Sequence, residues 1–589
     1  MIGIHSWKRG RYFRLSVVSS AVMLFAIHTA DAIAQAKEPP IQFHDDEKEL
    51  VQRDAYGSTN VPMDSWVYPA LERLANVGLI PSQSISIRPW SRNECRRQLA
   101  EAESNYMYMA ASQGDPLIDE VAPLIHDLKR EFDTVAAETP AAEVESVYVR
   151  AGTIAGPALS DGFHFGQTWR EDYGRPLGRG NSALAGFSVR ANRGRFFFYD
   201  RQELQYGPGK TAITPELSNL FNQIDMLPFG SAPNNPFPLT SATGAVVRQR
   251  PIELYAGLSF SGMQLSFGKQ QIYWGPTKSG PFSFSSNAEP TYNLRLVSTR
   301  PRNVPFLGGA VTYRYDVVFG KLSGHKFPAR PYFNGQKIEL TFGSHLEMGV
   351  TRWSLLWGEG HPMTLGSLKD NFFSSNSTGA TFAYGDRTDP GDRKSGFDLR
   401  LHVPGLERYL TVYADGYADD DLNPIDNPRR AAWNPGFYLS QLPFLHHMDL
   451  RFEAPSSMAM SEDEGGTRFF INNQYRDANT NKGFLLGNAV GRDARAYEVS
   501  TTYWKSGRTT YTALFRHVQG GRMLPGSQSI TDVSFTGSFA LSKEWTMTAF
   551  AQYERWLIPV LQPGPQRNGS AWITLTWNPK AESLLSRHK

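Results

Sequence analysis

The chain has 589 residues and a formal net charge of only +3. Its first 36 residues contain four basic side chains and one acidic one, so the remainder of the chain is formally neutral. No polybasic block remains that would favour nucleic acid or an anionic membrane surface, and we expect no nucleic-acid partner. Cys95 is the only cysteine, which excludes an internal disulfide. The 52 glycines and the 13% aromatic content are typical of many strands and turns.

The first 36 residues have the layout of a secretory signal peptide. Basic residues precede an apolar stretch at 15–27, and the small-residue motifs Ala30-Asp31-Ala32 and Ala34-Gln35-Ala36 follow it. The apolar stretch is too short for a membrane-spanning helix, which needs about 20 residues, although an uncleaved anchor is the alternative. We therefore expect a signal peptide at 1–36 and a linker at 37–60.

Residues 61–143 carry the apolar spacing of helices. Asp64 or Ser65 can cap a first helix, and Ser91 with Glu94 forms the Ser-x-x-Glu capping box of a second. A third apolar stripe follows. These stripes predict the core of a small helical bundle, and we assign them no ligand.

From residue 144 to 577 the apolar period changes to two. Apolar and polar residues alternate at 545–554, for example, as in a strand with one apolar and one polar face. Because a soluble β-sandwich shows the same alternation, the connections are more informative. Short turns such as Ser261-Gly262 alternate with long polar segments such as 207–250. Short connections at one rim and long ones at the other are typical of an outer-membrane barrel.

The alternating segments number about 18, and a bacterial single-chain barrel requires an even number. The sequence therefore predicts an all-β transmembrane fold: a closed antiparallel outer-membrane β-barrel of about 18 strands with a small N-terminal periplasmic α-helical bundle. We expect the bundle at 61–143, the barrel at 144–577 and a polar periplasmic tail at 578–589. Both termini are then periplasmic, and the long loops face the exterior. Aromatic residues near strand ends, including Tyr273 and Trp274, fit interfacial belts, and for each ring an ordinary packing role is the alternative.

Two stretches of the barrel region carry specific motifs. The first is Gly268-Lys269-Gln270 with Tyr273-Trp274-Gly275-Pro276, followed by Ser285-Ser286-Asn287-Ala288-Glu289-Pro290. The second is Thr480-Asn481-Lys482-Gly483, continuing through Leu486-Gly487 to Gly491-Arg492-Asp493. Both stretches, together with the N-terminal residues 61–74, resemble the Wzi-type capsule-assembly proteins of the outer membrane.

The resemblance implies a barrel whose outer surface binds capsular polysaccharide or a related exopolysaccharide and tethers it to the cell. It implies neither an enzyme nor a cofactor. We expect a monomer surrounded by outer-membrane lipid.

Sugars are held by planar hydrogen-bonding side chains and by aromatic rings that stack on apolar sugar faces. The segment 268–292 and the loop at 415–437 supply both kinds of side chain. The candidate carbohydrate-binding residues are Tyr273, Trp274, Asn287, Tyr292, Asp420, Asp421, Asn423, Asp426, Arg429, Arg430 and Trp433. The hypothesis is that the two loops form a shallow glycan surface. The alternative is that they only fold over the barrel mouth.

Metal and catalytic sites are disfavoured. The acidic run at 419–426 lacks the glycine and terminal glutamate of an EF-hand loop, and His446 and His447 would point to opposite faces of a strand. The sequence contains no Gly-x-Ser-x-Gly and no His-Glu-x-x-His motif. Two other functions stay open: a sugar-conducting porin, because eighteen strands can enclose a water-filled lumen, and an outer-membrane hydrolase built from scattered residues.

Overall fold

The structure is a computed structural model that describes residues 56–112, 116–132, 141–227, 242, 244–307, 309–373, 385–419, 424–458 and 466–579. The expected signal peptide, most of the expected linker and the tail beyond residue 579 lie outside the described residues. No helix in the described ranges is long and apolar enough to cross a membrane.

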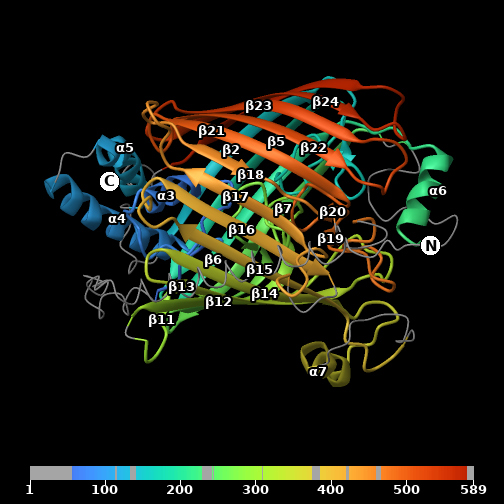
Figure 1. Ribbon diagram of the computed structural model, residues 1–589, viewed down its shortest axis with the longest axis horizontal. Helices are drawn as coiled ribbons and strands as arrows, with labels where there is room; N and C mark the ends of the chain where they lie inside the picture. Colours follow the sequence, from blue (N-terminus) through green and yellow to red (C-terminus); the bar gives the residue numbers. More distant parts are fainter. Residues whose placement is uncertain are drawn as a thin grey trace, which may run out of the picture.

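Eighteen strands of the described chain close into one antiparallel barrel, and the short β11 (Arg302–Asn303) pairs beside β12 (Figure 1). The eighteen are β2 (Ala141–Ile154), β5 (Gly180–Arg193), β6 (Phe196–Gly207), β7 (Val246–Phe260), β8 (Met263–Gln270), β10 (Thr291–Ser298), β12 (Val311–Lys321), β13 (Tyr332–Phe342), β14 (Leu346–Leu356), β15 (Asp392–His402), β16 (Leu410–Asp419), β17 (Ala432–Leu439), β18 (Leu450–Glu453), β21 (Ala494–Trp504), β22 (Thr510–Gly520), β23 (Ser529–Ala540), β24 (Trp545–Leu557) and β25 (Gln566–Trp577). β2 closes the ring, because Tyr148 lies opposite Gly186 of β5 and Thr576 of β25. The predicted barrel of about 18 strands is confirmed.

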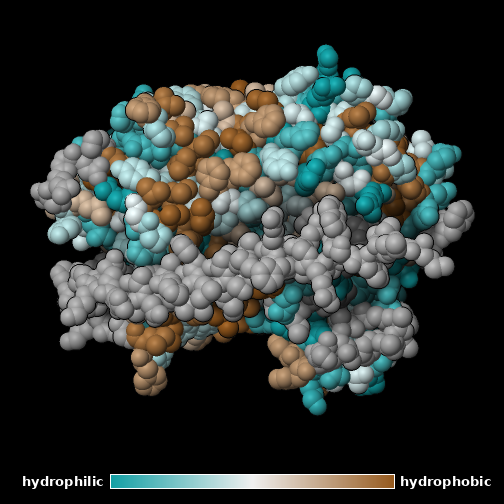
Figure 2. All heavy atoms as spheres, viewed as in Figure 1, coloured by the Kyte–Doolittle hydropathy of each residue, from teal (hydrophilic) through white to brown (hydrophobic). Residues whose placement is uncertain are grey.

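Side chains alternate between the outer and the luminal side of the barrel wall. On β24, Trp545 and Tyr553 are exposed, whereas Glu554 and Trp556 are buried. Exposed apolar side chains occupy the outward positions of many other strands: Val147, Val149, Phe187, Leu204, Ile338, Val350, Val499, Phe515, Val533 and Ile573. Figure 2 shows apolar side chains gathered over the strands on one face. An apolar outer wall and closed backbone hydrogen bonding are what a lipid environment requires.

The two ends of the barrel differ in the length of their connections. Tight turns join β5 to β6, β7 to β8 and β13 to β14 at one end, and Gly194, Gly262 and Gly343 adopt positive φ in them. The opposite end has long connections that include α6 (Pro215–Ile224) and α7 (Leu365–Phe373) (Figure 1). The expected asymmetry of the turns is therefore present. We call the two ends the helical end and the loop end.

Three N-terminal helices pack at the helical end, namely α3 (Val67–Asn76), α4 (Arg92–Ser112) and α5 (Pro116–Phe132) (Figure 1). Their buried apolar side chains form a cluster that includes Trp504 of β21. Helices and barrel therefore share a hydrophobic core. An ion pair between Glu72 of α3 and Arg451 of β18, with 2.7 Å between nitrogen and oxygen, adds to this contact.

The helix caps follow the sequence only in part. Half of the predicted capping box forms, because the Glu94 amide donates to Ser91 Oγ at 3.2 Å, but the Glu94 carboxylate pairs with Arg97 at 2.8 Å. At α3 the expected cap by Asp64 is wrong, since this carboxylate pairs with Arg201 of β6 at 2.8 Å. Ser65 Oγ instead accepts from the Val67 amide at 3.3 Å. The ion pair between Asp64 and Arg201 therefore stabilises the contact between the N-terminal helices and the barrel.

The largest buried cluster lies inside the barrel. Phe284, from the connection between β8 and β10, packs against Phe333 and Trp353 of the luminal wall, with ring centroids 5.7 and 5.1 Å apart. The connections also contain three small sheets, which pair β1 (Ile87–Arg88) with β9 (Tyr273–Trp274), β3 (Ser160–Asp161) with β4 (Gly166–Gln167), and β19 (Thr480–Asn481) with β20 (Phe484–Leu485). Folded chain therefore occupies much of the lumen.

Candidate functional site

Three connections between strands meet inside the barrel and fill its lumen. We call them the plug, which consists of residues 157–178, 271–290 and 466–493. The Tyr173 amide donates to the Ser286 carbonyl oxygen at 2.8 Å, and the Ser285 amide donates to the Leu486 carbonyl oxygen at 2.6 Å. Backbone hydrogen bonds therefore join the first connection to the second and the second to the third.

Gly487 shows why a glycine is needed in the plug. A Cβ at this position would overlap the carbonyl oxygen of Phe282 on the neighbouring connection. Only glycine lets two backbones approach so closely. The Leu486-Gly487 part of the second motif is thereby explained by packing within the plug.

Tyr273 and Trp274 lie in the plug, so their interpretation as part of an interfacial belt is wrong. They form β9, which pairs with β1 from the N-terminal region. The Trp274 Nε1 donates to Asp316 Oδ2 at 2.7 Å, and the Tyr273 hydroxyl donates to the Thr277 carbonyl oxygen at 2.7 Å. Both rings are buried. These contacts tie the plug to the wall and to the N-terminal segment.

Asn287 and Tyr292 lie on different sides of the barrel wall. Asn287 is buried in the plug, where its Nδ2 donates to the Leu485 carbonyl oxygen at 3.2 Å. Tyr292 is half exposed on the outer face of β10, beside the exposed Leu294. The structure therefore does not bring the four candidates of this segment to one exposed surface.

The candidates at 415–437 also separate. Asp420, Asp421 and Asn423 lie outside the described residues, while Asp426, Arg429 and Arg430 are exposed at the loop end between β16 and β17. Trp433 points outward from β17 and covers Gly416, where a Cβ would come within 2.6 Å of the indole ring. Its Nε1 donates to the Pro428 carbonyl oxygen at 2.9 Å. Trp433 therefore supports the base of the loop.

A charge cluster that was missed in the sequence holds the plug to the wall, and all of its members except the half-exposed Lys482 are buried. Glu289 forms ion pairs with Arg250 at 2.6 Å, with Lys269, and with Lys482 at 2.8 Å. Burial opposes ionisation of Glu289, but Arg250 and the two lysines outweigh it and lower its pKa to about 2. Three of the four residues belong to the two sequence motifs. The charged residues of those motifs were therefore the sequence signal from which this cluster could have been predicted.

A second buried cluster joins three loop-end elements. His164 lies between Asp161 of β3 and Asp225 after α6, with ring nitrogens 2.7 and 3.0 Å from the carboxylates, and Arg492 pairs with Asp225 at 2.6 Å. Burial lowers the pKa of His164, but the two carboxylates prevail and raise it to about 9. The charged imidazolium therefore holds β3, α6 and the third connection of the plug together.

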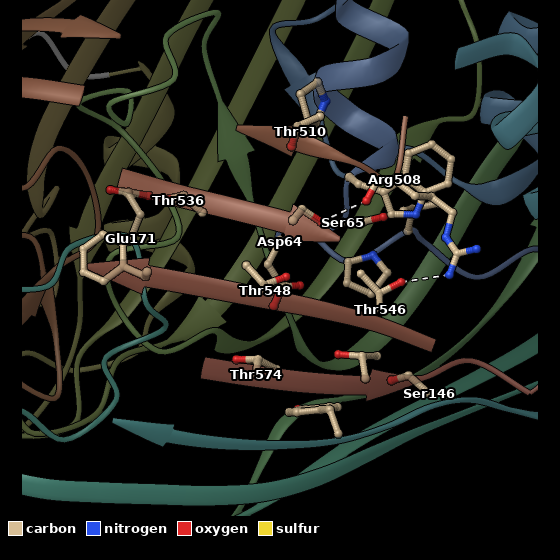
Figure 3. A pocket seen from close by; sticks show the side chains of 18 of the residues that line it. Asp64, Ser65, Ser146, Glu171, Arg508, Thr510, Thr536, Thr546, Thr548 and Thr574 are labelled. Carbon is tan, nitrogen blue, oxygen red and sulfur yellow. Dashed lines mark hydrogen bonds between the residues drawn. The ribbon is translucent and has the colours of Figure 1, made fainter. Parts of the chain in front are cut away.

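Between the plug and the N-terminal helices lies a cavity of about 750 Å³, which we call the chamber (Figure 3). The helical side contributes Ser65 and Trp66, the plug contributes Trp169 and Glu171, and the inner wall of β22 to β25 contributes many threonines. The lining also reaches Lys543, in the turn between β23 and β24 at the helical end. Across the described part of the chain, no three His, Cys, Asp or Glu residues group closely enough to hold a metal ion.

A family model described as capsule assembly protein Wzi matches residues 150–571. The chain belongs to this family. The solved structure of Wzi from Escherichia coli, described as an outer-membrane protein of group 1 capsule assembly and a carbohydrate-binding β-barrel, superposes with a TM-score of 0.61. It is 14% identical and covers 89% of this chain and 100% of that one. This protein is an outer-membrane β-barrel of the Wzi type.

Two further proteins are similar to parts of this chain or to its fold. An uncharacterised 55.8 kDa protein from the cps region of Klebsiella pneumoniae is 23% identical over 171 residues, which span 28% of this chain and 32% of that protein. The match thus covers about a third of that relative. OccK5 of Pseudomonas aeruginosa is 9% identical, with a TM-score of 0.38 over 74% of this chain and 98% of that one.

Proposed function

We propose that this protein is a non-enzymatic surface lectin that binds capsular or related exopolysaccharide and tethers it to the cell. The plugged lumen is the observation that carries the proposal, because a binder needs a stable surface and no open pore. Family membership and the carbohydrate binding stated for the E. coli protein support it. The polymer is the partner, and outer-membrane lipid surrounds a monomeric barrel.

In the proposed orientation the loop end faces the exterior, and the helical end and both termini face the periplasm. The long connections and the short turns support this orientation, since outer-membrane barrels place short turns on the periplasmic side. The exposed Asp426, Arg429 and Arg430 then reach the cell surface and are the proposed polymer contacts. Guanidinium groups can form bidentate hydrogen bonds with the carboxylates of acidic sugars.

A porin is the weaker alternative. Passage of a sugar would require the backbone hydrogen bonds within the plug and the Glu289 cluster to open. Removing one partner from a buried ion pair costs about 3–5 kcal/mol, so spontaneous opening of several such contacts is rare. The packing of the described plug thus favours a surface binder.

The test compares polysaccharide retained on cells that carry the native protein, a deletion, or the double variant Arg429→Ala, Arg430→Ala. We expect the deletion to release polymer into the medium without reducing its synthesis, and the double variant to release an intermediate amount. Arg193→Ala, Arg195→Ala is the matched control, because both arginines are exposed at the opposite end. Polymer that stays cell-bound after deletion would rule out tethering.

A further inference from the structure

The wall of the chamber carries a band of threonine side chains. Inward positions of four neighbouring strands contribute Thr510, Thr512, Thr536, Thr546, Thr548, Thr574 and Thr576. The register places Thr548 opposite Thr574, on adjacent strands (Figure 3). Elsewhere the luminal positions hold large side chains such as Trp353 and Phe333, so the short threonines leave the space that forms the chamber.

Several of these hydroxyls are free to bind a ligand. Thr546 Oγ1 accepts from Arg508 at 2.8 Å, but the hydroxyls of Thr536, Thr548 and Thr574 make no hydrogen bond to any described protein group. All three side chains are partly exposed to the chamber. Each hydroxyl can donate one hydrogen bond and accept two.

The charged groups around the chamber are largely paired with one another. Arg150 bonds Asp172 at 2.8 Å, and Arg170 bonds Glu498 at 2.5 Å. Lys278 and Lys543 also line the chamber, are exposed and form no ion pair with a described carboxylate, so the lining accepts a ligand that is neutral or carries few negative charges. An apolar ligand would strip water from the threonine hydroxyls without replacing its hydrogen bonds, which is costly.

An aromatic pair lies on the same wall. Phe550 of β24 and Trp572 of β25 are stacked, with ring centroids 5.3 Å apart, and both line the chamber. Phe550 and the Arg150 guanidinium, which lies 4.4 Å from the indole centroid, both stack on Trp572, so Phe550 is the ring of this pair that is left for the apolar face of a sugar. The neighbouring hydroxyls can bind the hydroxyl groups of the sugar. The chamber volume lies within the range of about 300–1,000 Å³ that is usual for small-molecule sites.

We propose that the chamber is a binding site for a short oligosaccharide that enters from the helical end. The plug closes the other end, and the lining reaches Lys543 and Asn578 at the helical rim, so a ligand approaches from that side. This site is separate from the loop-end surface. The chamber is inferred from its own geometry. The inference rests on the proposed function in one respect, namely that the oligosaccharide comes from the polymer that the protein tethers.

The test is calorimetric titration of the full-length protein in detergent. The probe is a set of two- to four-sugar fragments, made by partial hydrolysis of the host cell's own surface polysaccharide. In the double variant Thr548→Val, Thr574→Val, we expect affinity to fall about thirtyfold, the effect of losing two hydrogen bonds of typical strength. Valine keeps the branched shape, so the strands remain intact.

Two further variants sharpen the result. Thr548→Ser, Thr574→Ser keeps both hydroxyls and is expected to retain affinity. Thr153→Val makes the same chemical change on the exposed outer side of β2 and is expected to have no effect.

No binding of any fragment, or equal binding by the native protein and the valine variant, would overturn the proposal. Such a failure leaves the tethering proposal intact if intact polymer still binds and Arg429→Ala, Arg430→Ala weakens it. Failure of both readouts contradicts both proposals.

Discussion

At the scale of single residues, the motifs describe how a plug is packed. Gly487 allows two backbones to touch, and the amide of Val490 donates to Asn488 Oδ1 at 2.8 Å, which fixes the following turn. Glu289 and Lys482 form an ion pair between two connections of the plug. Each of these residues has a structural reason that is independent of any sugar.

Replacing Gly487 by alanine is expected to destabilise the plug by about 1–3 kcal/mol, because the added methyl group overlaps the Phe282 carbonyl oxygen. Thermal unfolding in detergent, followed by circular dichroism, measures the loss. Gly569→Ala is the control, since a Cβ there meets nothing within 4 Å. Equal unfolding temperatures for the two variants would contradict the close approach of the backbones at Gly487 and Phe282.

At the scale of elements, buried ionic clusters join connections that are far apart in the chain. His164 links β3 to α6 through Asp161 and Asp225, and Phe221 stacks on its ring at 4.1 Å. Arg492 extends the cluster to the third connection of the plug. Because the folded-state pKa of His164 lies above its ordinary value of 6.5, the charged ring contributes stability that is complete below pH 6.5.

That contribution is expected to disappear as the pH rises through about 9, and it amounts to about 3 kcal/mol at neutral or lower pH. The test compares unfolding temperatures of native protein and His164→Gln at pH 6, 7.5 and 9.5. We expect a large difference at pH 6 and a small one at pH 9.5. His126→Gln changes an exposed histidine of α5 and serves as the control. A difference that does not depend on pH would refute the role of the charge.

The elements also show where sequence patterns fail. β8 lies within the region where the apolar period is two, as predicted, but the tract after it fills the lumen and does not form the expected glycan-binding loop. Gly, Pro and Ser predict irregular backbone equally well on either side of the wall, and the pairing of β9 with β1 joins residues almost two hundred positions apart. The outward orientation of Trp433 could not be predicted for a related reason. Alternation shows which residues share one face of a strand, but it does not show which face points away from the lumen.

At the scale of the whole molecule, the barrel, its strand number and the two unequal ends could be predicted because each depends on local pattern. The plug, the chamber and the charge clusters could not, because they depend on long-range contacts inside the lumen. Asp426, Arg429 and Arg430 remain the described members of the predicted site that are exposed at the loop end. The tryptophan and tyrosine of β9 instead belong to the buried structure that joins the plug to the barrel wall and to the N-terminal segment.

A plugged barrel predicts that the native protein conducts no steady ionic current in planar lipid bilayers. Replacing residues 277–285 by a Gly-Ser linker removes Phe282 and Phe284 from the luminal core, so water can connect the chamber with the loop end. We expect this variant to conduct. The same replacement at residues 561–565, in the connection between β24 and β25 outside the plug, is expected to stay closed. Porin-like conductance of the native protein would show that the plug opens, and the channel would then replace tethering as the favoured function.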